Sequence, residues 1–157
     1  MSSNNGLENL LNDLKPLHLF KNLENDEIFE IMKISQVKKY PKNSLIFSEG
    51  DEQDFSMFVI IEGKVEISAR SEKTNDEISL FYAGRGLSFG EMSFLDQQPR
   101  SATIKTLEDT SAFVITRAFF DILLETQPKV AAKLIIGLAT ILSRRLRATD
   151  HKLKYSI

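Results

Sequence analysis

The sequence contains no cysteine and no tryptophan, and it has only two histidines among 157 residues. Without cysteine there is no disulfide framework, no thiol nucleophile and no thiolate metal site. The two histidines, His18 and His151, lie at opposite ends of the sequence and form no metal-binding cluster, so we expect no bound metal. No apolar run approaches the ~20 residues that a membrane-spanning helix needs, and we expect no membrane span.

The sequence also has no large excess of charge of one sign, since it contains 20 Lys and Arg residues and 22 Asp and Glu residues, which gives a net charge of −2. Such a chain has no overall attraction for polyanions, so we expect no direct binding of nucleic acid. The sequence has no Walker loop, nucleophile elbow or metallophosphodiesterase cluster, which favours a binding protein over an enzyme. No secretory signal pattern opens the chain, and we expect a cytoplasmic protein.

The spacing of apolar residues changes twice along the chain, from helical to alternating and back. Helical spacing covers 6–34, short alternating runs separated by turn residues cover 35–116, and helical spacing returns over 117–127 and 128–154. About eight short strands at regular spacing are typical of a sandwich or barrel. The sequence therefore predicts one domain over residues 1–157, mainly β, with N-terminal helices and two C-terminal helices.

The long C-terminal helix carries an apolar stripe that is longer than one small β domain needs. The stripe comprises Leu134, Leu138, Ile141, Leu142, Arg145 and Thr149, widened by Ile135 and Leu146. We expect the helix to form a homodimer through residues 129–153, the alternative being that the stripe only packs in the core. The basic residues Arg144, Arg145 and Arg147 are interpreted as a solvated face and not as a nucleic-acid patch.

Residues 89–103, FGEMSFLDQQPRSAT, are more specific than the rest of the chain. Gly90 allows a close backbone approach, the next residues suit one helical turn, and Arg100 follows Glu91 by nine positions. Free N–H groups at a helix start and a guanidinium both attract phosphate. The Glu91 carboxylate would repel an anion, but it would accept a hydrogen bond from a ribose hydroxyl. The segment therefore favours a ligand with a phosphate beside a sugar hydroxyl.

This segment resembles the phosphate-binding cassette of the cyclic nucleotide-binding domain family. The family pattern F-G-E-[LM]-[AS]-x-[LIVM], followed by P-R-x-A-T, is met without insertion or deletion. Upstream, residues 46–65 resemble the family signature IxxxGDxxDxxYfIxxGxV, with Phe58 where tyrosine is common. We expect Asp51 and Asp54 to fasten this turn by hydrogen bonds to the backbone. The resemblance covers nearly the whole chain and implies an eight-stranded antiparallel β-roll, or jelly roll, between flanking helices.

The resemblance implies a role for each residue of the cassette. Arg100 would bind the cyclic phosphate, Glu91 the ribose 2′-OH, and main-chain amides would complete the anion cradle. Ser101 follows the arginine at a position where alanine or serine is common in adenine binders, which favours cAMP over cGMP. The ligand-binding residues implied within the cassette are Phe89, Gly90, Glu91, Met92, Ser93, Arg100, Ser101 and Ala102.

The resemblance also implies that the long C-terminal helix covers the base of the nucleotide. Alignment with the corresponding helix of a bacterial family member places Thr149 over adenine N6. Counting from Pro128 shifts the register by four residues and nominates Arg145 instead. Both lie on one face, because four residues advance about one turn of ~3.6 residues; we rank Thr149 first.

The function we expect is that of a cyclic nucleotide receptor that changes conformation on binding and signals to an unidentified protein partner. One alternative is a protein-interaction module that keeps the fold without the ligand. Another is a transcription regulator of the same superfamily without its DNA-binding domain. Too few residues follow the long helix in this sequence for a helix-turn-helix module.

Overall fold

The computed structural model describes residues 2–156, which divide into two compact units. One unit is built from two separate segments, the described parts of Met1–Lys33 and Leu123–Ile157. The other unit is the continuous segment Ile34–Ile122. The continuous unit contains the whole β structure and the cassette, and the two-segment unit contains the terminal helices.

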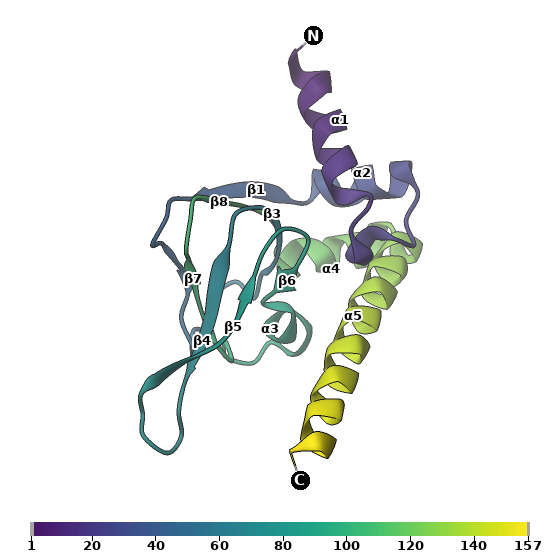
Figure 1. Ribbon diagram of the computed structural model, residues 1–157. Helices are drawn as coiled ribbons and strands as arrows, with labels where there is room; N and C mark the ends of the chain where they lie inside the picture. Colours follow the sequence, from purple (N-terminus) through teal and green to yellow (C-terminus); the bar gives the residue numbers. More distant parts are fainter. Residues whose placement is uncertain (1, 157) are drawn as a thin grey trace. The chain divides into compact units, whose positions relative to one another are not determined.

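The continuous unit is a roll of two four-stranded antiparallel sheets, which confirms the predicted fold class (Figure 1). One sheet has the strand order β1 (Gln36–Tyr40), β8 (Thr110–Ile115), β3 (Met57–Glu62) and β6 (Ser88–Phe89). The other has the order β2 (Leu45–Phe47), β7 (Thr103–Thr106), β4 (Val65–Arg70) and β5 (Glu77–Ala83). Apart from the consecutive strands β4 and β5, neighbours in each sheet come from distant parts of the sequence, and this brings the cassette back to the loop between β2 and β3.

Apolar side chains from both sheets fill the interior of the roll. Ile67 on β4 and Ile104 on β7 are register partners and both are buried. Phe58 on β3 faces Val114 on β8 in the same way in the other sheet. Because side chains alternate between the two faces of a strand, each sheet sends every second residue inward. The apolar side chains of the short runs in the sequence therefore form one core between the two sheets.

The connection from β3 to β4 depends on Gly63. Its φ of +106° lies in the left-handed region, and a Cβ there would collide with the side chain and backbone of Thr110. Only glycine fits such a close approach of two backbone segments. The bend between β3 and β4 therefore requires glycine at this position.

Helix α4 (Arg117–Thr126) holds the short helix of the cassette, α3 (Glu91–Asp96), in place. The side chain of Arg117, at the start of α4, donates from Nη1 to the carbonyls of Phe94 and Leu95 at 2.8 and 2.9 Å. These carbonyls belong to the last turn of α3, where helical partners are missing. The ring of Phe94 also packs edge-on against Phe120, with centroids 5.3 Å apart. Helix α3 is therefore fixed from its C-terminal end.

The two-segment unit contains α1 (Ser2–Leu14), the short 3-10 helix η1 (His18–Phe20), α2 (Asn25–Lys33), the end of α4 and α5 (Pro128–Tyr155). An ion pair joins α5 to α2, with Lys133 Nζ 2.7 Å from Glu27 Oε1. This hydrogen bond from Lys133 is the largest cause of a lowered pKa for Glu27. No helix within residues 2–156 is both long and apolar enough to cross a membrane.

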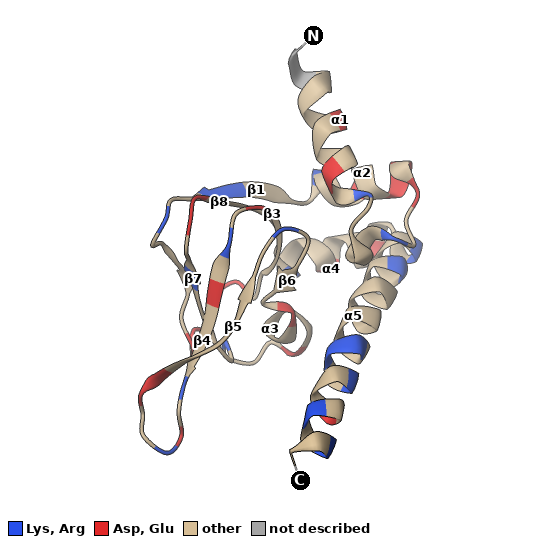
Figure 2. Ribbon diagram, viewed as in Figure 1, with Lys and Arg blue, Asp and Glu red and all other residues tan. Residues whose placement is uncertain are grey.

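The apolar stripe predicted on α5 divides into two stretches. Leu134 and Leu138 are completely buried, so the first half of the stripe packs inside the protein. Leu146 and Leu153 are 63% and 59% exposed. The second half of the stripe is therefore open to a partner, on a stretch of α5 that also carries many Lys and Arg residues (Figure 2).

Candidate functional site

The cassette begins where β6 ends at Phe89 and α3 begins at Glu91, with Gly90 between them. Gly90 has a φ of +79° and caps the helix. A Cβ on Gly90 would lie 2.8 Å from the Ser56 carbonyl oxygen and 2.9 Å from Arg100 Nη1. Glycine at this position thus lets the start of α3 approach the arginine closely. The first amides of a helix have no acceptor within the helix, so a helix start of this kind suits an anion.

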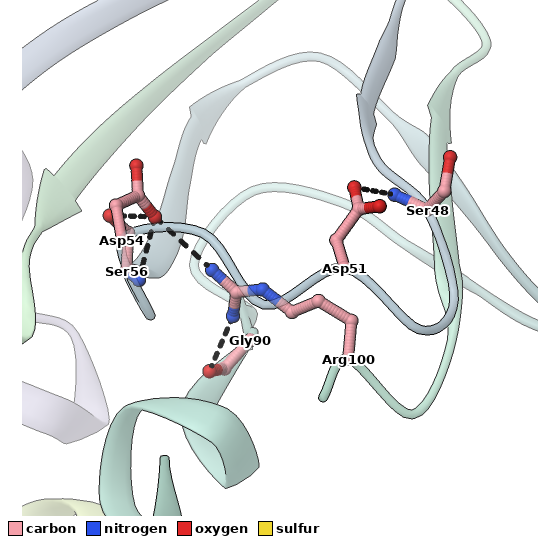
Figure 3. A network of polar contacts seen from close by, with 6 residues as sticks. All are labelled: Ser48, Asp51, Asp54, Ser56, Gly90 and Arg100. Atoms are coloured by element: carbon pink, nitrogen blue, oxygen red, sulfur yellow. Dashed lines mark hydrogen bonds and ion pairs between the residues drawn. The ribbon is translucent and has the colours of Figure 1, made fainter. Parts of the chain in front are cut away.

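Arg100 points into the roll and is only 3% exposed (Figure 3). Its Nη1 donates to the Gly90 carbonyl at 3.1 Å, and its Nη2 lies 3.6 Å from Asp54 Oδ1. The guanidinium also lies over the ring of Phe47, 4.1 Å from the ring centroid. Three contacts from three directions therefore hold one buried positive charge in a fixed orientation.

The loop between β2 and β3 holds the backbone of Arg100. The Arg100 N–H donates to the Asp51 carbonyl at 2.9 Å, and the Gly50 N–H donates to the Arg100 carbonyl at 2.8 Å. Asp51 Oδ2 accepts a hydrogen bond from the Ser48 amide, and Asp54 Oδ1 accepts from Ser56 N and Oγ (Figure 3). These bonds confirm that the two aspartates fasten the loop. Asp54 in addition carries the counter-charge of Arg100.

One donor of Arg100 has no acceptor within the described part of the chain. Its Nε is buried and has no hydrogen-bond partner among residues 2–156. Buried donors in folded proteins are nearly always paired, and an exception calls for an explanation. Burial lowers the pKa of Arg100, and the nearby charges of Asp54 and Asp51 oppose that shift. An anionic acceptor at Nε would satisfy the donor and compensate the buried charge.

Glu91 is the first residue of α3 and is only 5% exposed. An ionised carboxylate accepts hydrogen bonds and does not donate them, so it suits a hydroxyl and opposes a phosphate. The preceding residue, Phe89, is also buried, and its ring stacks on Phe58 at a centroid distance of 4.9 Å. The cassette thus contains a buried carboxylate and a buried guanidinium.

The remaining cassette residues lie around the same turn. Ser93 is buried, Ala102 is half-buried, and Met92 and Ser101 are exposed. The Ser101 hydroxyl donates to the sulfur of Met92 at 3.7 Å, which joins the two ends of the cassette. All eight cassette residues predicted from the sequence belong to the continuous unit.

Arg145 and Thr149 belong to α5, in the two-segment unit. The Thr149 hydroxyl donates to the Arg145 carbonyl at 3.0 Å, one turn earlier on the same helix. Arg145 is half-buried, and this burial lowers its pKa. That these two residues cover the base stays a prediction.

Two contributors to the site were missed by sequence reasoning. The spacing of Asp54 after Asp51 was interpreted only as a turn, although this second aspartate pairs with Arg100. Phe47 carried no signal at all, because it meets the guanidinium across more than 50 positions of sequence. Within residues 2–156, no group of three His, Asp or Glu side chains is placed to hold a metal ion.

The comparisons with known proteins bear on the same residues. The sequence profile described as "Cyclic nucleotide-binding domain" matches residues 37–127. The cyclic AMP receptor protein of Thermus thermophilus is 34% identical over 89% of this chain and 62% of its own length. Human cGMP-dependent protein kinase 2 is 30% identical over 73% of this chain and 15% of its own length. The chain thus spans less than two thirds of the bacterial relative.

Among solved structures, a cyclic nucleotide-binding domain from Methylobacillus flagellatus superimposes with a TM-score of 0.83 at 25% identity. The superposition covers 98% of this chain and 85% of that one. The likeness therefore includes both the roll and the flanking helices, and the profile match includes the complete cassette. The chain belongs to the cyclic nucleotide-binding domain family.

Proposed function

We propose that this protein is a cAMP receptor that binds the nucleotide in its cassette. The observation that carries this proposal is the buried Nε of Arg100, which has no acceptor among residues 2–156. The guanidinium lies next to Gly90, the cap of the short helix α3, and Glu91 is the first residue of that helix. A cyclic phosphate supplies the missing acceptor, and its ribose supplies a hydroxyl donor. Such a ligand uses the buried arginine and the buried acid together.

In this proposal Arg100 binds the cyclic phosphate, together with amides around Gly90, Glu91 and Met92 and those of Ser101 and Ala102. Glu91 accepts the hydrogen bond of the ribose 2′-OH. Ser101 lies beside Met92 at the exposed side of the cassette, where it would contact the base. Thr149 or Arg145 would contact the base from α5.

A ligand changes the conformation of a protein only if it binds one arrangement better than another. We propose that the moving part is the helical segment 117–157, hinged near residues 126–128. The boundary between the two compact units falls at residues 122 and 123, within α4 and close to this hinge. Closure of the helices would then signal to a protein partner.

The choice between cAMP and cGMP rests on Ser101 and on the name of the Thermus relative, whereas the human relative is named for cGMP. We expect cAMP to raise the melting temperature more than cGMP at equal concentration. A ligand at 100 times its Kd contributes about 2.7 kcal/mol to stability. A thermal shift series measures the melting temperature with each nucleotide, and calorimetry measures the affinity for each. A larger effect of cGMP would overturn the base assignment, and no effect of either nucleotide would favour the protein-interaction module.

We also propose a homodimer formed through α5. Leu142, Leu146, Thr149 and Leu153 are spaced by four, three and four residues, which is the repeat of a coiled-coil seam. We expect the double variant Leu146→Asp with Leu153→Asp to be a monomer in light scattering, because two buried charges would face each other across the seam. Ile136→Asp, at an exposed position off the seam, should leave the mass unchanged. A double variant with the mass of the wild type would contradict the dimer.

The curated bacterial relatives are named as a cyclic AMP receptor protein and cAMP-activated transcriptional regulators. We therefore propose a regulatory and non-enzymatic role in the cytoplasm.

A further inference from the structure

A second polar pocket lies in the two-segment unit, between η1 and α5. Its volume is about 130 Å³, room for several water molecules. Every residue that lines it belongs to the same unit. The lining residues are His18, Lys21, Asn22, Gly137, Thr140, Ile141 and Arg144.

The pocket concentrates positive charge without a counter-charge. Lys21 and Arg144 both line it, and neither forms an ion pair with an acidic side chain within the described part of the chain. No Asp or Glu is among the described lining residues. Like charges that share a small pocket repel each other, and an anion between them removes that repulsion.

Hydrogen-bond donors dominate the lining. Arg144 Nη1 lies 3.3 Å from His18 Nδ1, and because a guanidinium only donates, the imidazole nitrogen accepts. The Thr140 hydroxyl donates to the Ile136 carbonyl at 2.8 Å, so its proton is already used. The Lys21 ammonium, the remaining guanidinium protons and the Asn22 amide are left as donors. Such a set matches a group that offers several acceptor oxygens.

The backbone around the pocket is held rigidly. Gly137 admits the carbonyl oxygen of Leu19 so closely that any Cβ would collide with it. Leu19 and Phe20 are buried, and the Lys21 amide donates to the His18 carbonyl at 3.4 Å. The backbone segments that carry the donors, one directly after η1 and one on α5, are therefore held together, which reduces the entropy lost when an anion binds.

We propose that this pocket binds a small oxyanion of the phosphate class, held by Lys21 and Arg144. The flat guanidinium fork and the ammonium would contact different oxygens of the same group. Two sources offer this group, phosphate free in solution and a phosphorylated side chain of a partner protein. The proposal does not depend on nucleotide binding in the cassette, which lies in the other unit.

The two histidines make the test specific to this site. In NMR spectra the imidazole C–H signals of His18 report on the pocket, and those of His151 serve as an internal reference. The full chain, with and without added cAMP, is titrated with inorganic phosphate at constant pH and ionic strength, with chloride as the balancing salt. We expect the His18 signals to shift saturably with phosphate while those of His151 stay in place.

Variants identify the anchors of the anion. Arg144→Gln should weaken phosphate binding by about tenfold or more, since a charge-assisted contact to an anion contributes at least 1.4 kcal/mol. Arg147→Gln, three residues further along α5, does not line the pocket and should change the affinity less than twofold. A His18 shift that never saturates, or that is the same in Arg144→Gln, would overturn the proposal. Tighter binding of phosphoserine than of inorganic phosphate would identify a phosphorylated side chain as the source.

Discussion

Replacing Arg100 by alanine is expected to weaken cAMP binding by about 2 to 5 kcal/mol, a loss of roughly 30-fold to several thousand-fold in affinity. The guanidinium is the only cation buried in the cassette within the described residues, and its Nε is the donor left for the phosphate. Its removal leaves the bound anion with backbone amides alone. Isothermal titration calorimetry with cAMP measures the effect directly.

Truncation of Arg100 also removes its contacts with Asp54 and Phe47, so folding must be checked separately. Arg100→Lys keeps a charge but loses the planar fork, and it should remain folded with weakened binding. Arg70→Ala removes an exposed arginine of the same unit and should bind cAMP as the wild type does. Wild-type affinity in Arg100→Ala would refute the assignment of the site.

Glu91→Gln should have a smaller effect, about 1 to 2 kcal/mol on cAMP affinity, because one hydrogen bond to a charged acceptor is weakened. The same change should have little effect on a 2′-deoxy ligand, which lacks the hydroxyl. An equal loss for both ligands would assign Glu91 a structural role and would leave the role of Arg100 untouched.

Replacing Gly90 by alanine is expected to destabilise the fold and to weaken ligand binding at the same time. A left-handed conformation costs an L-residue about 1 to 2 kcal/mol. The new Cβ would in addition approach the Ser56 carbonyl and Arg100 Nη1 within 3 Å, where neither backbone nor buried guanidinium has space to move. We expect a total near 3 kcal/mol, within the range of backbone strain plus overpacking. Urea denaturation gives the stability, and calorimetry gives the affinity.

Gly50 offers a matched control for this substitution. Its φ of +89° is close to the +79° of Gly90, but a Cβ on Gly50 would meet no atom within 4 Å. Gly50→Ala should therefore show the conformational cost alone and keep most of the ligand affinity. Equal urea midpoints and equal affinities for the two variants would show that the contact with Arg100 has no effect.

The sequence predicts the architecture well where a pattern repeats. Strand β4 alternates between apolar and polar residues, and β3 and β8 are short apolar runs bounded by turn residues, so their positions follow from the sequence. Strand β6 has only two residues and cannot show a period, so it was not predicted. The exposure of the second half of α5 was likewise hidden, because Leu138 and Leu146 look alike in sequence but only the first is buried.

The cassette was predictable from local sequence because its residues are close in the chain. The contacts of Arg100 with Asp54 and Phe47 were not, since they form across the roll and depend on which strands become neighbours. The close backbone approach at Gly90 was suggested by residue type. The atoms that make it necessary, on Ser56 and Arg100, appear only in three dimensions.

The division of one unit between both ends of the chain affects how the protein is made. Glu27 and Lys133, which pair across α2 and α5, are 106 positions apart. During translation, residues 34–122 emerge as one continuous piece and can complete their sheets, whereas η1 and α2 must wait for α5, which they contact, to leave the ribosome. An early part of the nascent chain is therefore among the last to find its final partner.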